Sequence, residues 1–110
     1  MTGLADEHCT PLPTGTPPLS PADWPALVTQ IDPAWQVIDS HHLKRVFKLP
    51  DFARGLALIN AIGALAEAED HHPDLVLAWG RVEVTLWTHS VGGLSRNDFI
   101  LAARIDRLPA

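Results

Sequence analysis

The sequence has a single cysteine, few basic residues and no long apolar run, and each shortage excludes a class of protein. Cys9 cannot form an intrachain disulfide, so we expect a free thiol in a reducing cytoplasm. Eight Lys and Arg against thirteen Asp and Glu give a net charge of −5, which would repel a nucleic-acid backbone. No apolar stretch approaches the ~20 residues that cross a bilayer, and no secretory signal is recognisable. We therefore expect a cytoplasmic protein that binds neither nucleic acid nor membrane.

Several catalytic motifs are also missing. The sequence has no nucleophile elbow, no glycine-rich phosphate loop and no Cys-x-x-Cys pair. Six histidines and thirteen carboxylic residues remain, and this set suits proton transfer without a covalent intermediate. A metal site is not favoured, because the adjacent histidines point apart and no His-x-x-x-His pair occurs.

The length of 110 residues is that of a single domain with one core. Residues 1–18 are rich in Pro, Thr and Gly, and such a segment buries too little to offset its ordering entropy. We therefore predict a flexible arm over residues 1–18 and one domain over residues 19–110. A sizeable pocket would open at the surface or at a contact between subunits.

Apolar periodicity predicts helices over residues 21–30, 52–70 and 96–107, and strands over residues 35–38, 42–49, 75–79 and 81–89. Asp51 is a natural N-cap for the long helix, and Ser95 to Asp98 has the form of a capping box. The order α-β-β-α-β-β-α favours an α+β fold, in which three helices cover one face of a four-stranded antiparallel sheet. The other face would need a partner, so we expect an oligomer.

Four of the six histidines form adjacent pairs. We interpret His41 and His42, in a predicted polar turn, as solvent-exposed. His71 and His72 lie where the long helix ends, and Glu67 would fix the tautomer of His71 if the helix persists that far. A purely structural alternative stays open, because histidine at a helix C-terminus complements the helix dipole.

Two further candidates lie at the ends of predicted elements. His89 ends the last strand, and Asp98 follows nine residues later in the first turn of the last helix. Each has a structural alternative, as a polar residue at a strand edge and as part of a capping box. These alternatives are compatible with function, because sites are usually built at loops and element ends.

The segment from Glu67 to Asp98 resembles the signature of the pterin-4a-carbinolamine dehydratases. That signature is an acidic residue, three others, His-His-Pro, an aromatic residue, a later His and an Asp. Its elements here are Glu67, His71, His72, Pro73, Trp79, His89 and Asp98. The stretches 60–67, 79–85 and 96–104 are also similar to bacterial members, and the resemblance covers about residues 19–107.

The resemblance implies a four-stranded antiparallel sheet with helices on one side, assembled as a homodimer or homotetramer. It implies dehydration of 4a-hydroxytetrahydropterin to quinonoid dihydropterin, which recycles the cofactor of aromatic amino acid hydroxylases. Pterin is then the substrate, no cofactor or metal is expected, and such a hydroxylase is a candidate partner.

The resemblance also implies roles for individual residues. His71 and His89 would act as acid and base, and His72 would orient the pterin. Glu67 would support His71, and Asp98 would hold or polarise His89. The remaining substrate-binding positions are Pro73, Thr88, Ser90 and Val91.

Proteins of this fold also include two non-enzymatic classes. One resembles the dehydratases but assists RuBisCO assembly beside carboxysome genes, and the intact set of three histidines and Asp98 argues against that role. Animal relatives also serve as a dimerisation cofactor for a homeodomain transcription factor, a role that would use the sheet or helix surface.

Overall fold

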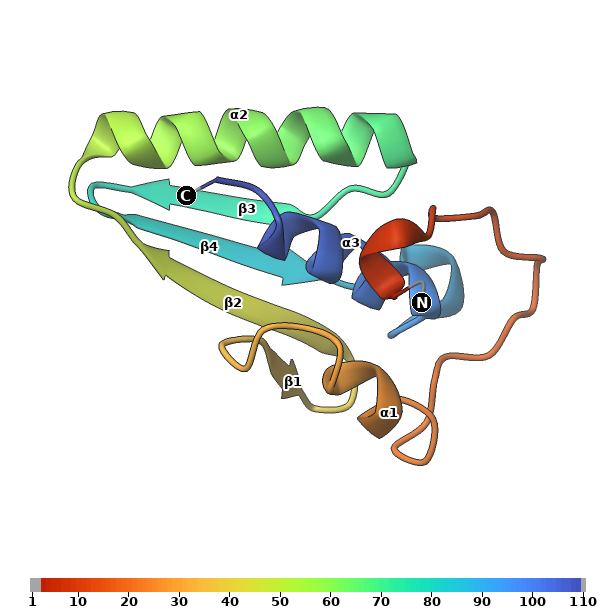
Figure 1. The fold of residues 1–110 in the computed structure, drawn as a ribbon. Helices are drawn as coiled ribbons and strands as arrows, with labels where there is room; N and C mark the ends of the chain where they lie inside the picture. Colours follow the sequence, from red (N-terminus) through yellow and green to blue (C-terminus); the bar gives the residue numbers. More distant parts are fainter. Residues whose placement is uncertain (1–2, 110) are drawn as a thin grey trace.

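The computed structural model describes residues 3–109 and has the element order that the sequence predicts (Figure 1). Its helices are α1 (Pro25–Val28), α2 (Phe52–Glu69) and α3 (Arg96–Asp106), and its strands are β1 (Gln36–Ile38), β2 (His42–Lys48), β3 (Asp74–Ala78) and β4 (Arg81–Leu86). Two 3₁₀ turns are added, η1 (Leu4–Asp6) and η2 (His89–Val91). The predicted α+β class is confirmed.

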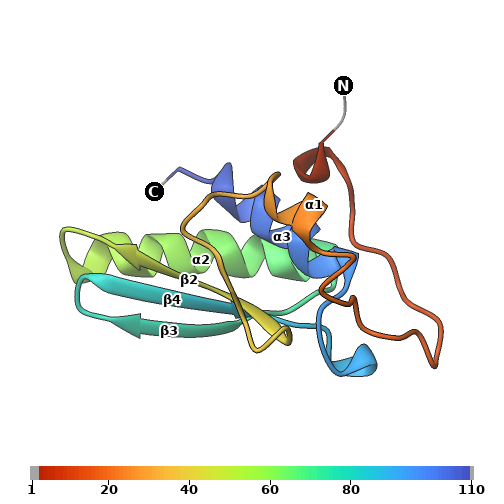
Figure 2. The same ribbon diagram turned by 90° about the horizontal axis from the view of Figure 1, so that it is seen from below.

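The four strands form one antiparallel sheet in the order β1-β2-β4-β3, and the helices lie on one of its faces (Figure 2). β4 is central, and its side chains alternate between the two faces. Val82, Val84 and Leu86 are completely buried beneath the helices. On the opposite face Val46 and Val76 flank Glu83 and are 41% and 49% exposed.

The helices contribute unequally to the core. α2 packs on β3 and β4 through a narrow stripe, made of Gly55, Leu58, Ile62 and Ala66. Phe52 and Leu56 of the same helix lie outside this stripe and are exposed, although both are apolar. α3 contacts α1, α2 and η1, and this position buries most of its residues.

The first helix is shorter than the prediction over residues 21–30. α1 begins at Pro25, because proline has no N–H to donate and fits the first helical position. Residues 21–23 form a turn instead, in which the Asp23 carboxylate accepts from the backbone N–H and hydroxyl of Ser20. The N-cap at Asp51 is confirmed, since its side chain accepts from the N–H of Arg54.

The sequence predicts a flexible arm over residues 1–18, but residues 3–10 lie against α3 and the end of α2. Leu4 is 1% exposed and belongs to the hydrophobic core. Glu7 receives two hydrogen bonds from the Arg96 side chain, at 2.8 and 2.6 Å. A single buried leucine carries no periodicity, so composition alone gives no sign of this packing. Residues 11–18 are largely exposed.

Candidate active site

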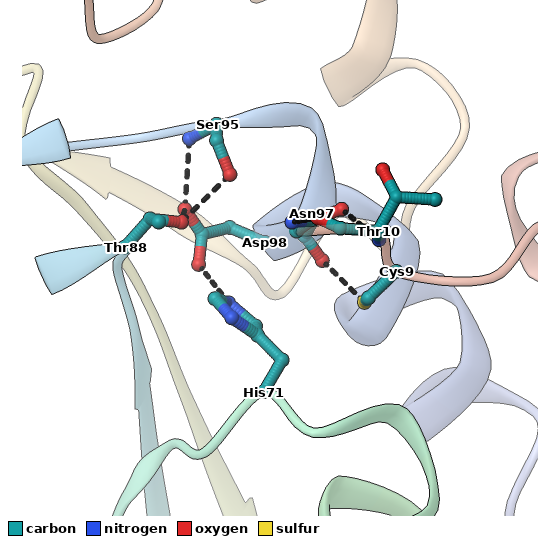
Figure 3. Close-up of polar contacts among 7 residues, drawn as sticks. All are labelled: Cys9, Thr10, His71, Thr88, Ser95, Asn97 and Asp98. Carbon is teal, nitrogen blue, oxygen red and sulfur yellow. Dashed lines mark hydrogen bonds and ion pairs between the residues drawn. The ribbon is translucent and has the colours of Figure 1, made fainter. Parts of the chain in front are cut away.

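The candidate site lies where the α2–β3 connection, the end of β4 and the start of α3 meet (Figure 3). Here Nε2 of His71 lies 2.6 Å from Oδ1 of Asp98, although 27 residues separate the two in sequence. The Asp98 side chain is completely buried, and that of His71 is 11% exposed. A buried carboxylate–imidazole pair with one partner reaching the surface is an arrangement suited to proton transfer.

Asp98 is held by the first turn of α3. Its Oδ2 accepts from the Ser95 N–H and from the Thr88 hydroxyl, both at 2.9 Å, and the first bond is one half of the predicted capping box. Its neighbours can all donate, as an ionised carboxylate requires, and the helix N-terminus favours negative charge. The Nε2 of His71 therefore carries a proton in this pair, which leaves Nδ1 available.

The predicted pairing of Glu67 with His71 is wrong. α2 ends at Glu69, and Asp70 adopts a left-handed conformation with φ of 51°, so His71 leaves the helical path and turns toward Asp98. Glu67 instead pairs with His72, with 2.5 Å between Oε1 and Nε2. Both of these side chains are exposed, at 78% and 55%.

The predicted position of His89 at a strand end is also wrong. β4 ends at Leu86, and the carbonyl of Thr88 accepts from the N–H groups of Val91 and Gly92, which folds residues 89–91 into η2. Gly92 closes this turn with φ of 70°, a conformation that glycine adopts without strain. The Asp98 carboxylate is hydrogen-bonded to His71 and not, as the sequence had predicted, to His89.

His89 stacks instead on Trp87, with ring centroids 3.8 Å apart and planes 24° apart. The Trp87 ring also lies beside that of His41, with centroids 4.6 Å apart. The interpretation of His41 and His42 as a solvated pair is therefore wrong, since both are half-buried and their Nδ1 atoms lie 3.1 Å apart. Trp87 is a site residue that the sequence reasoning missed. Its signal was an aromatic residue among the otherwise polar residues that alternate along the strand predicted over residues 81–89.

A surface cleft of about 350 Å³ brings the three site histidines together. Its lining consists of Asp70, His71, His72, Pro73, Asp74, Trp87, Thr88, His89 and Ser90. Three predicted residues lie outside this lining: Val91, Asp98 and Glu67. Asp98 reaches the cleft through its contact with His71, and Glu67 through its contact with His72. Trp79 is 73% exposed in the β3–β4 turn, at the end of β4 remote from the cleft.

A second cavity, of about 510 Å³, adjoins the cleft at Asp70, His71, Thr88 and Ser90. Its far wall is residues 8–12, together with Glu69 and Asn97. Burial raises the pKa of the Cys9 thiol in this wall to about 12, and the nearby carboxylates add to the effect. The thiol therefore stays protonated at neutral pH and is not a nucleophile. The sequence reasoning also missed Thr10 and Asn97.

Among residues 3–109, no three His, Cys, Asp or Glu side chains are arranged to hold a metal ion. None of the helices in the same range combines the length and apolar character needed to cross a membrane.

A family model and the relatives found by sequence comparison point to the same family. The model of the family described as pterin 4 alpha carbinolamine dehydratase matches residues 17–108. A protein from Alkaliphilus metalliredigens, provisionally named a pterin-4-alpha-carbinolamine dehydratase, is 47% identical over 107 residues, covering 97% of this chain and 96% of that protein. A protein of the same provisional name from Chlorobium limicola is 49% identical, covering 94% of each chain.

A solved structure is similar in fold as well as in sequence. It is the crystal structure of a transcriptional coactivator/pterin dehydratase from Brucella melitensis, which is 31% identical to this chain. The superposition has a TM-score of 0.74 and covers 80% of this chain and 94% of that one.

Proposed function

This chain belongs to the pterin 4 alpha carbinolamine dehydratase family and is a hydro-lyase, and we propose that it dehydrates 4a-hydroxytetrahydropterin in the cleft of His71, His72 and His89. The observation that carries this proposal is the buried His71–Asp98 pair, which opens on a cleft with two further histidines. Burying such a pair costs desolvation energy that an apolar pair would avoid. A protein acting only as a scaffold has no use for it.

The reaction needs one proton acceptor and one proton donor. The N5 lone pair forms the C4a–N5 double bond as the C4a–O bond breaks, N5 loses its proton, and the departing oxygen takes up a proton and leaves as water. Electrons and atoms balance without an oxidant or reductant. Two histidines on one cleft supply both transfers near neutral pH.

We assign the base role to His71, because Asp98 stabilises the imidazolium that forms when Nδ1 accepts the N5 proton. His89 then protonates the leaving hydroxyl, and its stacking on Trp87 orients the ring. His72, paired with Glu67 at the rim, orients the pterin. Pro73, Thr88 and Ser90 complete the binding surface, and Val91 supports it from η2.

The proposal extends to the setting of the reaction. Pterin is the substrate and no metal or further cofactor takes part. The product, quinonoid dihydropterin, returns to the cofactor pool of aromatic amino acid hydroxylases in the cytoplasm, and such a hydroxylase is the proposed partner. The exposed Val46 and Val76 on the uncovered sheet face support a homodimer or homotetramer.

Turnover of chemically generated carbinolamine, measured against its spontaneous dehydration, tests the proposal. His71→Ala and His89→Ala should each lower kcat by about 10²–10⁴-fold. Trp79→Ala is the matched control, because Trp79 lies outside the cleft, and should keep the parent rate. Near-parent rates in both histidine variants would contradict the assignment. A parent protein that does not exceed the spontaneous rate would favour the assembly-factor role instead.

A further inference from the structure

The larger cavity beside His71 is walled by a part of the chain outside the matched family region. The family match begins at residue 17, whereas residues 8–12 line this cavity. The Alkaliphilus relative aligns over 97% of this chain, so its similarity reaches beyond the family region. Figure 3 shows Cys9 and Thr10 beside the first turn of α3, close to the His71–Asp98 pair. We call residues 8–10 the strap.

One side of the strap is bonded to the end of α2. The Cys9 N–H donates to Oε1 of Glu69 at 2.8 Å, and Nδ1 of His8 lies 2.9 Å from Oε2. Glu69 is the last residue of α2, and its side chain is 5% exposed. It lies two residues before His71, so these bonds fix the point from which the chain turns toward the site.

The other side of the strap is bonded to the start of α3. The Thr10 N–H donates to Oδ1 of Asn97 at 3.1 Å, and Nδ2 of Asn97 donates to the Thr10 carbonyl at 2.8 Å. Asn97 is 6% exposed and immediately precedes Asp98. The strap thus bonds to Glu69, two residues before His71, and to Asn97, one residue before Asp98.

We propose that the strap holds the end of α2 against the start of α3, so that Glu69 and Asn97 are positioning residues for His71 and Asp98. The inference rests on the proposed dehydration. His71 and Asp98 lie on separate elements, and α2 stops short of His71, so their alignment depends on whatever joins the two elements. A misplacement of about 1 Å at a reacting group can cost on the order of 10²-fold in rate.

Full-length variants test this role. Glu69→Ala and Asn97→Ala should each lower kcat by about tenfold or more, with KM within about twofold of the parent value, because alignment rather than substrate binding is lost. Glu69→Gln keeps an acceptor for the Cys9 N–H and should restore most of the rate. Arg107→Ala is the matched control: it breaks the contact with Asp6, in the same N-terminal segment but away from the site, and should stay at the parent rate.

Thr10→Pro is a second test of the strap, because proline lacks the N–H that donates to Asn97 while Asn97 itself is unchanged. It replaces Asn97→Ala if that variant fails to fold. It should lower kcat and change the pH dependence of the His71 ring signals in NMR spectra. Parent values of kcat in Glu69→Ala and Thr10→Pro, with an active parent, would overturn the strap. So would a Glu69→Gln variant as slow as Glu69→Ala. An inactive parent would instead overturn the proposed dehydration.

Discussion

The Asp98→Asn substitution changes one atom in the centre of the site. In the parent, Oδ2 accepts two hydrogen bonds, from Ser95 and Thr88, while Oδ1 faces Nε2 of His71. An asparagine satisfies the two donors by placing its carbonyl at the Oδ2 position. Its NH₂ group must then face His71, and Nε2 has to become an acceptor. The substitution therefore reverses the tautomer of His71 and leaves its cationic form without a carboxylate.

The two effects of this change have different sizes. Loss of one charge-assisted hydrogen bond should cost about 1.5–3 kcal/mol of folding free energy. Loss of the base should lower kcat by about 10²–10⁴-fold, which corresponds to about 2.7–5.4 kcal/mol in the barrier. Asp98→Ala is more severe for folding, since it leaves Ser95, Thr88 and His71 without their acceptor, at about 3–5 kcal/mol.

Three measurements on Asp98→Asn separate these effects. Urea unfolding gives the change in folding free energy, initial rates of carbinolamine dehydration give kcat across the pH range, and ¹⁵N shifts of the His71 ring report its tautomer. We expect a folded protein with a large loss of kcat and an Nδ1-protonated His71. A folded variant with the parent rate and pH profile would refute the pairing of Asp98 with a catalytic His71.

Three further predictions concern other residues. Burial raises the pKa of the Cys9 thiol to about 12. At pH 8 this thiol should therefore react with iodoacetamide about 10³-fold more slowly in the folded protein than in the urea-unfolded protein. Equal rates in the two states would contradict its burial. Burial opposes the ionisation of Glu69, but its hydrogen bonds with His8 and Cys9 and the charge of Arg104 together lower its pKa below 4.5. The ionised Glu69 therefore stabilises the fold above pH 4.5, and this contribution is lost as the pH falls further. Glu69→Gln should therefore flatten the pH dependence of unfolding free energy below pH 4.5, and an unchanged slope would show that these bonds do not form. Arg45→Met removes the donor that lies 2.6 Å from Oδ1 of the largely buried Asp106. It should lower the free energy of unfolding in urea by about 1.5–3 kcal/mol. A loss no larger than that of an exposed ion pair would contradict this contact.

Features that depend on neighbouring residues could be predicted from the sequence. The α2 N-cap at Asp51 and the capping box from Ser95 to Asp98 form as predicted, because each needs a side chain and a backbone group three residues apart. The order of helices and strands follows from apolar periodicity for the same reason. The signature spacing also placed His71, His72 and His89 in one group, and the cleft contains all three.

The partners of these residues could not be predicted. Glu67 and His71 have helical spacing, but a left-handed Asp70 ends the helix and separates them. Asp98 was expected to hold His89, but the chain folds into η2 and His71 takes that carboxylate. Trp79 belongs to the signature yet lies outside the cleft, whereas Trp87 lies within it.

The sequence by itself determined the kinds of chemical group available, the local caps and the alternation that builds the sheet, because these depend on covalent order and short-range geometry. Only the tertiary structure decided which carboxylate serves which histidine. It also decided that residues 8–10 bond to both elements of the site, at Glu69 and at Asn97. The His71–Asp98 contact and the bonds of residues 8–10 join residues 27 to 87 positions apart. Such contacts depend on how whole elements pack, and no local pattern in the sequence encodes them.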